Sequence, residues 1–106
     1  TTTLMTVAAE KIVKINRITV ANVDGAAAAD VSLFVDGLTT AGATGISPTG
    51  ASATVYLAKT ISVPADATLV ISDTPIYLME GDILKGGASA ASDLDLFISY
   101  EVLDDA

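Results

Sequence analysis

Residues 94–102 read Leu94-Asp95-Leu96-Phe97-Ile98-Ser99-Tyr100-Glu101-Val102. Every second side chain, from the first leucine to the valine, is aliphatic or aromatic, and three of the four between them are polar. A period of two is typical of a β-strand that turns one face to a core and the other to water, whereas a helix repeats every 3.6 residues. We therefore expect a strand here, and the same alternation recurs along most of the chain.

The segments before this strand are rich in Val, Ile and Thr, and no dozen residues show the three-and-four apolar spacing of a helix. Turn signals such as Asp24-Gly25 separate these segments. A change of phase near Asn16 indicates a β-bulge. The further strands that we expect are Lys11–Ile15, Arg17–Val23, Asp30–Val35, Thr54–Val63, Thr68–Ser72, Ile76–Leu78 and Ile83–Lys85.

Two connections differ from the others in composition. The stretch from Leu38 to Ala53 is mostly Gly, Thr, Ala and Ser, and a loop of this length in a small domain usually has a function or is ordered by a partner. Gly86 to Ser92 is a shorter run of small residues that we expect to be a loop before the last strand.

About eight short strands joined by mixed long and short connections favour an all-β, two-sheet β-sandwich of the jelly-roll type over a meander barrel. An immunoglobulin-like sandwich is the alternative, although its buried Trp and paired Cys are missing. We expect residues 11–106 to form a single sandwich domain, which is long enough to bury its own core. Residues 1–10 are expected to be an N-terminal arm or an edge strand.

The charge balance restricts the partners. The chain has 5 Lys and Arg against 13 Asp and Glu, which gives a net charge of −8. Binding to nucleic acid depends on clustered basic side chains, so we expect no nucleic-acid partner. The longest uncharged run, from Gly37 to Ala58, is interrupted by Gly and Pro and does not suit a membrane-spanning helix. No membrane partner is expected.

Few residues suit catalysis, because the chain contains no His and no Cys. Without His, no side chain is suited to general acid–base work near neutral pH or to activating a Ser or Thr nucleophile. Asp93 with Asp95, and Asp104 with Asp105, are pairs of the kind that strand ends in acidic proteins commonly hold, and they are weak candidates for a glycosidase pair. No calcium-binding or phosphate-binding loop motif is present. We therefore predict a protein that is not an enzyme, with no catalytic, cofactor-binding or metal-binding residues.

Four of the five aromatic side chains fall out of phase with the aliphatic face of their strands: Phe34, Tyr56, Tyr77 and Phe97. Loops or the N-terminal arm of the same chain could cover these rings. Alternatively, they form a subunit interface, because interfaces are enriched in aromatic residues. A carbohydrate-binding platform is the third interpretation, and the absence of Trp disfavours it. We take the four aromatic residues as interface candidates.

Four phrases between Arg17 and Glu101 carry a resemblance to a known group of proteins: Ile18–Gly25 (ITVANVDG), Tyr56–Leu69 (YLAKTISVPADATL), Pro75–Asp82 (PIYLMEGD) and Asp93–Glu101 (DLDLFISYE). With these phrases the chain resembles small virion structural proteins of tailed bacteriophages, particularly those of marine and cyanobacterial hosts. The Leu38 to Ala53 loop is the part least like that pattern.

The resemblance implies a component of the virus particle. A capsid decoration, or cement, protein that docks on the outer surface of the virion is the first expectation. Its partners would be other virion proteins, either the major capsid protein or tail proteins, and further copies of itself, with a trimer as the first guess. A tail or fibre component that contacts the host is the alternative within the virion. A carbohydrate-binding or adhesion module is the alternative outside it.

Overall fold

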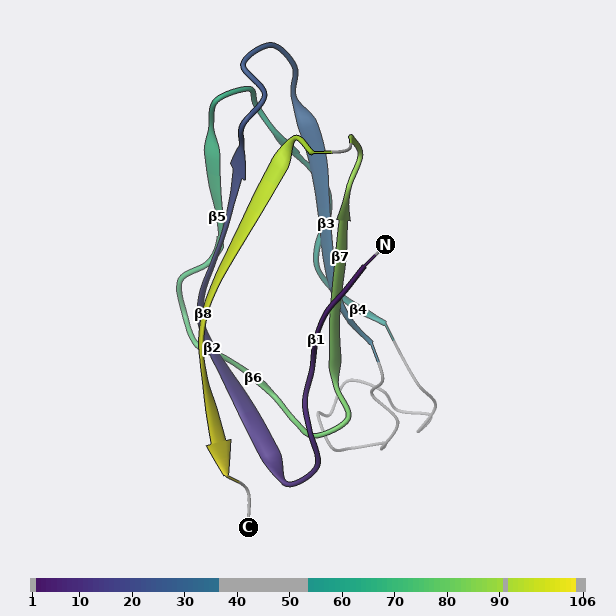
Figure 1. The fold of residues 1–106 in the computed structure, drawn as a ribbon, viewed down its shortest axis with the longest axis vertical. Coiled ribbons are helices and arrows are strands. Elements are labelled where there is room, and N and C mark those ends of the chain that lie inside the picture. Colours follow the sequence, from purple (N-terminus) through teal and green to yellow (C-terminus); the bar gives the residue numbers. More distant parts are fainter. Residues whose placement is uncertain (1, 37–53, 91, 105–106) are drawn as a thin grey trace.

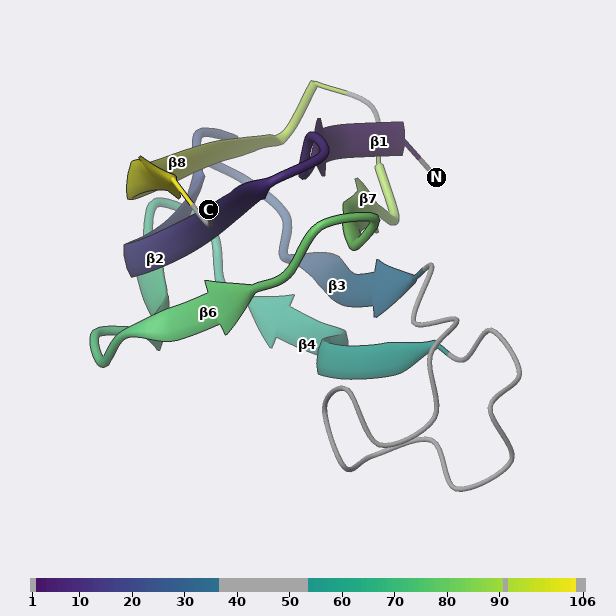
Figure 2. The same cartoon turned by 90° about the horizontal axis from the view of Figure 1, so that it is seen from below.

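The computed structural model describes residues 2–36, 54–90 and 92–104. Within them, eight strands form two sheets that face each other (Figures 1 and 2). The strands are β1 (Thr2–Thr6), β2 (Lys11–Asn22), β3 (Ala29–Asp36), β4 (Val55–Val63), β5 (Thr68–Ser72), β6 (Ile76–Leu78), β7 (Ile83–Ala88) and β8 (Leu94–Asp104). The all-β, two-sheet β-sandwich expected from the sequence is confirmed. The stretch from Leu38 to Ala53, predicted as a long loop, lies outside the described residues.

The first sheet has the strand order β1-β7-β3-β4, and every pairing in it is antiparallel. The second sheet is built around β2, the longest strand. β8 pairs with β2 along its full length on one side, while β5 and β6 pair with different halves of its other side. The chain passes repeatedly from one sheet to the other, which brings β1 and β8 to the same side of the molecule (Figure 2).

β2 contains the bulge that the phase change near Asn16 predicts. Its register with β8 shifts between Ile15 and Arg17, so β2 has one extra residue there and β8 remains regular. The shift allows Ile15 and Ile18, which a regular strand would place on opposite faces, both to lie in the core with no exposed surface. A single strand therefore replaces the two shorter segments expected on either side of Asn16.

The core lies between the two sheets and is aliphatic. Its largest fully buried side chains are Ile15, Ile18, Val20, Leu33, Val63 and Leu84. They come from β2 in the second sheet and from β3, β7 and the edge strand β4 in the first, so both sheets supply the centre of the core. Edge strands β1 and β8 contribute side chains that are only partly covered.

β7 is longer than the sequence predicts. Gly86 and Gly87, which we expected to begin a loop, continue the strand after Lys85. Glycine is unfavourable in strands because it has no side chain to pack. Here Gly86 pairs with both Thr2 of β1 and Leu33 of β3, so hydrogen-bonded neighbours on both sides hold it in the sheet.

Candidate interaction surface

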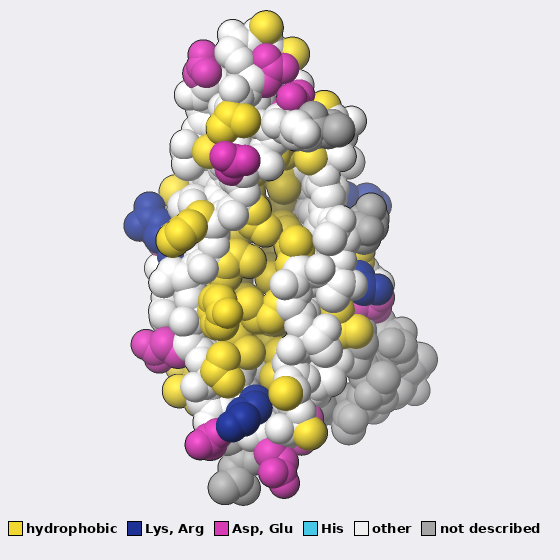
Figure 3. Space-filling model, viewed as in Figure 1, with side chains coloured by type: hydrophobic (Ala, Val, Ile, Leu, Met, Phe, Trp, Pro, Cys, Tyr) yellow, Lys and Arg dark blue, Asp and Glu magenta, His cyan; other side chains and the backbone are white. Residues whose placement is uncertain are grey.

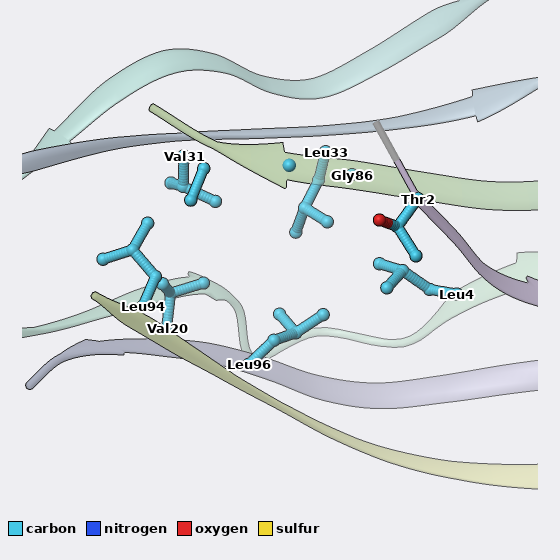
Figure 4. Close-up of a pocket in the computed structure, with 10 residues that line it drawn as sticks. Thr2, Leu4, Val20, Val31, Leu33, Gly86, Leu94 and Leu96 are labelled. Atoms are coloured by element: carbon cyan, nitrogen blue, oxygen red, sulfur yellow. The ribbon is translucent and has the colours of Figure 1, made fainter. Parts of the chain in front are cut away.

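One long side of the sandwich is open. Edge strands β8 and β1 flank this side, and in the described part of the chain neither strand pairs with the other. Figure 3 shows a groove that runs between the two sheets and is lined with hydrophobic side chains. Its upper part is a pocket of about 210 Å³, and the side chains of the two sheets face each other across it (Figure 4). The lining residues are Thr2, Leu4, Val20, Val31, Leu33, Gly86, Gly87, Ala88, Leu94 and Leu96.

The wall of this groove on the first sheet depends on Gly86. A Cβ atom at this position would lie 2.5 Å from Cδ2 of Leu33 and 2.9 Å from the backbone oxygen of Ser32. The absence of a side chain thus lets Leu33 pack directly over the β7 backbone. Leu4 of β1 approaches the same point, with its Cδ1 atom 3.3 Å from the position of that Cβ. The groove is therefore lined by leucine methyl groups that meet above a glycine.

The wall on the second sheet is formed by β8, and it is less covered than the sequence predicts. The alternation in residues 94–102 assigns Tyr100 and Val102 to a buried core face. They do face inward, opposite the buried Ile15 and Val13 of β2. However, Tyr100 is 50% exposed and Val102 is 55% exposed. Our interpretation of this face as ordinary core is wrong at these two residues, because β8 is an edge strand beside the open side of the sandwich.

The outer edge of β8 is also unpaired within the described residues. The strand has 11 residues and pairs only with β2. Proteins usually protect long edge strands with proline, lysine, a bulge or a covering loop. β8 has no proline or lysine, and the bulge beside it belongs to β2. Its backbone donors and acceptors on this edge are therefore open to another strand.

One ion pair lies at the C-terminal end of β8. The ammonium group of Lys11 donates a hydrogen bond to a carboxylate oxygen of Asp104, to which it is opposite in the sheet. This hydrogen bond and the attraction between the charges lower the pKa of Asp104. Both side chains are well exposed, so the pair is expected to add little to stability. It marks the polar end of an otherwise apolar groove.

The structure divides the four aromatic interface candidates between the two outer faces of the sandwich. Phe97 on β8 and Tyr77 on β6 lie on the outer face of the second sheet, where they are 70% and 54% exposed. Phe34 and Tyr56 are directly opposite each other on β3 and β4, on the outer face of the first sheet. No single surface contains all four rings.

The two aromatic residues of the first sheet form a small cluster. The ring centroids of Phe34 and Tyr56 are 5.2 Å apart, with the rings tilted by 45°. The ammonium group of Lys59 lies 5.1 Å from the centroid of the Tyr56 ring, within the range of a cation–π contact. These contacts order the rings without covering them, because Tyr56 is still about half exposed.

A second pocket and the hydrogen bonds beside it involve β3, β4 and the end of β7. This pocket, of about 230 Å³, lies beside the bulge of β4. The amide of Thr60 donates to Oγ of Ser32 at 2.9 Å, and the amide of Asp30 donates to Oγ of Ser89 at 2.8 Å. These bonds connect β3 to β4 and to the residue that follows β7. Among residues 2–36, 54–90 and 92–104, no three His, Cys, Asp or Glu side chains are grouped so as to hold a metal ion.

Tyr100 is not among the predicted interface residues, because the residue pattern contains no signal for its exposure. Alternation identifies the face on which a side chain lies, but it does not tell whether a neighbouring strand covers that face.

The described part of the chain also has no helix that is long and apolar enough to cross a membrane. No protein-family model, curated protein or solved structure matches the chain.

Proposed function

We propose that this protein is a non-enzymatic structural component of a bacteriophage particle, and that it decorates the outer surface of the capsid. The observation that carries the proposal is the exposure of aromatic rings on both outer faces of a small acidic sandwich. Tyr56, Tyr77 and Phe97 are each about half exposed or more. Exposed aromatic side chains of this kind are typical of protein–protein interfaces.

The charge and the architecture support the same assignment. A net charge of −8 helps to keep the chain soluble before assembly. The sandwich offers two flat outer faces, and each carries a pair of aromatic residues that could dock on a capsid protein. The resemblance of the four strand-and-turn phrases to phage virion proteins gives the class of partner. In this proposal the partners are the major capsid protein and further copies of the chain.

Counting copies of the protein in purified virus particles tests the proposal. A decoration protein is expected in numbers comparable to the major capsid protein, as measured by quantitative mass spectrometry of particles. A handful of copies per particle would instead support a tail or fibre component that contacts the host. Absence of the protein from particles would overturn the virion assignment and favour a carbohydrate-binding or adhesion module.

A docking experiment tests the role of the aromatic residues. We expect Phe97→Ser to fold normally and to bind more weakly to capsids stripped of the protein, because the ring is 70% exposed and supports little of the core. Val23→Ser is the matched control, since Val23 is 55% exposed and lies outside the strands. Unfolding of the Phe97→Ser variant would show that Phe97 belongs to the core. Equal capsid binding by both variants would remove Phe97 from the docking surface.

A further inference from the structure

We propose that two copies of this chain associate through the open edge of β8, so that the second copy's β8 becomes the next strand of the same sheet. The two copies are related by a two-fold axis that is normal to the sheet and passes midway between the two copies of Tyr100. This inference rests on the edge, the groove and the order of side chains in β8. It does not depend on the virion assignment.

The edge itself is suited to strand addition. β8 is regular over 11 residues, because the bulge in its only described pairing lies on β2. An unprotected strand of this length offers a row of backbone donors and acceptors to a second strand. Its three charged side chains are all acidic: Asp95, Glu101 and Asp104. A second copy must therefore pair in a register that keeps these acids apart.

The geometry of a two-fold axis leaves few registers. Because the axis is normal to the sheet, the inner faces of both copies stay on the same side, and residues that face each other across the edge share a face. With the axis at Ile98, Asp95 would lie opposite the second copy's Glu101, and like charges directly opposite each other are destabilising. With the axis at Ser99, Phe97 would lie opposite Glu101.

Only the next register places both exposed apolar residues at the C-terminal end of β8, Val102 and Leu103, opposite apolar residues of the second copy. It also places Leu96 opposite the second copy's Asp104 at each end of the pairing. With the axis at Tyr100, Phe97 lies opposite the second copy's Leu103, and Ser99 lies opposite Glu101. Phe97 is 70% exposed and Leu103 is 39% exposed in the single chain. Aromatic and aliphatic side chains opposite each other stabilise a strand pair. Residues 97–103 of β8 are thus complementary to themselves about Tyr100, and the Leu96–Asp104 pairs lie at the two ends.

The same axis also covers the exposed part of the inner face. Tyr100 then packs against its own counterpart, and Val102 lies opposite the second copy's Ile98. Tyr100 and Val102 face inward and are about half exposed in the single chain, so this contact covers them. β1 lies level with the C-terminal half of β8 along the long axis of the molecule, and both strands border the open side of the sandwich (Figures 1 and 2). An axis normal to both sheets therefore brings the two copies of β1 toward each other as well, and the two grooves close into one interior.

A cysteine scan tests the arrangement, because the chain has no cysteine of its own. A residue on the axis lies opposite its own counterpart in the second copy. The two Cα atoms are then about 4.5–5.5 Å apart, a distance that suits a disulfide. We expect Tyr100→Cys to form a covalent dimer under mild oxidation. Ile98→Cys and Ser99→Cys should cross-link at least tenfold more slowly, because each lies opposite a different residue. Faster cross-linking at either of these two positions would overturn the register.

Light scattering and sedimentation of the unmodified chain test the association itself. The expected particle has the mass of two 10.7 kDa chains, reached as protein concentration rises. Tyr100→Lys should shift the dissociation constant upward at least tenfold, because two ammonium groups would meet at the axis. Val70→Lys is the matched control, since Val70 is 42% exposed but lies on β5, on the other side of β2 from β8, and it should leave the constant unchanged. A trimer, or a monomer at all concentrations, would overturn the proposal.

Discussion

At the scale of single residues, Asn22 is the polar side chain on which the top of the sandwich depends. It is 3% exposed, and its amide donates to the carbonyl oxygens of Ala27 at 3.0 Å and Val63 at 2.9 Å. Its side-chain oxygen accepts from the amide of Asp24. One side chain therefore ties the end of β2 to the following loop and to the end of β4.

Replacing Asn22 with Ala should cost about 3 kcal/mol of unfolding free energy, because it leaves buried backbone groups without partners. Urea denaturation measures the loss. Asp24→Ala is a suitable control, since its side chain accepts an exposed hydrogen bond from the amide of Ala26, and it should cost less than about 1 kcal/mol. Equal losses in the two variants would show that the Asn22 bonds do not hold the loop.

Asp82 gives the fold a pH dependence. Burial raises the pKa of its carboxyl group, and the hydrogen bond from the amide of Met79 lowers it by a smaller amount. The folded chain therefore holds this proton more tightly than the unfolded chain. The stability that the group contributes is fully present below its ordinary pKa of 3.8 and decreases as pH rises through the higher pKa of the folded state.

Asp82→Asn removes this titration and keeps an oxygen that can accept from Met79. We expect the unfolding free energy of the variant, relative to the natural chain, to increase as pH rises from below 3.8 toward neutrality. Urea denaturation at a series of pH values measures the difference. A difference that decreases with pH would show that the turn stabilises the ionised carboxylate.

At the scale of elements, the sequence identifies strands better than it identifies their neighbours. The predicted bounds Thr68–Ser72 and Ile76–Leu78 coincide with β5 and β6. The bulge near Asn16 is also found, because it leaves a phase change in the apolar pattern. Which strands pair, and that β8 lies at an edge, depends on contacts between residues distant in the chain, and a local pattern does not encode them.

Strand propensity predicts the wrong end for β7, because it places a loop at Gly86, where the strand continues. A substitution at Gly86 tests the packing at this position. We expect Gly86→Ala to destabilise the protein by about 1–3 kcal/mol, because its Cβ would overlap the Leu33 side chain and the backbone oxygen of Ser32. Leu33 lines the groove pocket, so its methyl group can shift, but the backbone oxygen of Ser32 is held by the pairing of β3 with β7. Thermal and urea denaturation measure the change.

Gly25→Ala is the matched control for that experiment. A Cβ at Gly25 would meet only carboxylate oxygens of Asp66 at 3.6 and 3.8 Å, which are ordinary contacts. Its unfolding free energy should stay within about 0.5 kcal/mol of the natural chain. If Gly86→Ala were equally harmless, Leu33 would not be packed against the β7 backbone as described.

At the scale of the whole molecule, the interaction surface is harder to predict than the fold. Sequence alternation correctly places Tyr77 and Phe97 on an outer face, because that depends only on their own strands. It does not show that the four aromatic candidates divide between two sheets, or that the groove beside Tyr100 stays open. Both facts depend on how the sheets are assembled, and on the position of β1 opposite β8.

The charge of the whole chain predicts how association responds to salt. Two copies with a net charge of −8 each repel one another, while the contacts proposed at Tyr100, Phe97 and Leu103 are apolar. Salt shortens the screening length from about 10 Å at 0.1 M to about 3 Å at 1 M, and apolar contacts are not weakened by it. The dissociation constant measured by sedimentation should therefore fall as sodium chloride is added.

A basic strand from another protein would respond in the opposite way, because salt would weaken its attraction to Asp95 and Glu101. Weaker self-association at high salt would show that charge pairs, and not the apolar edge, hold the copies together.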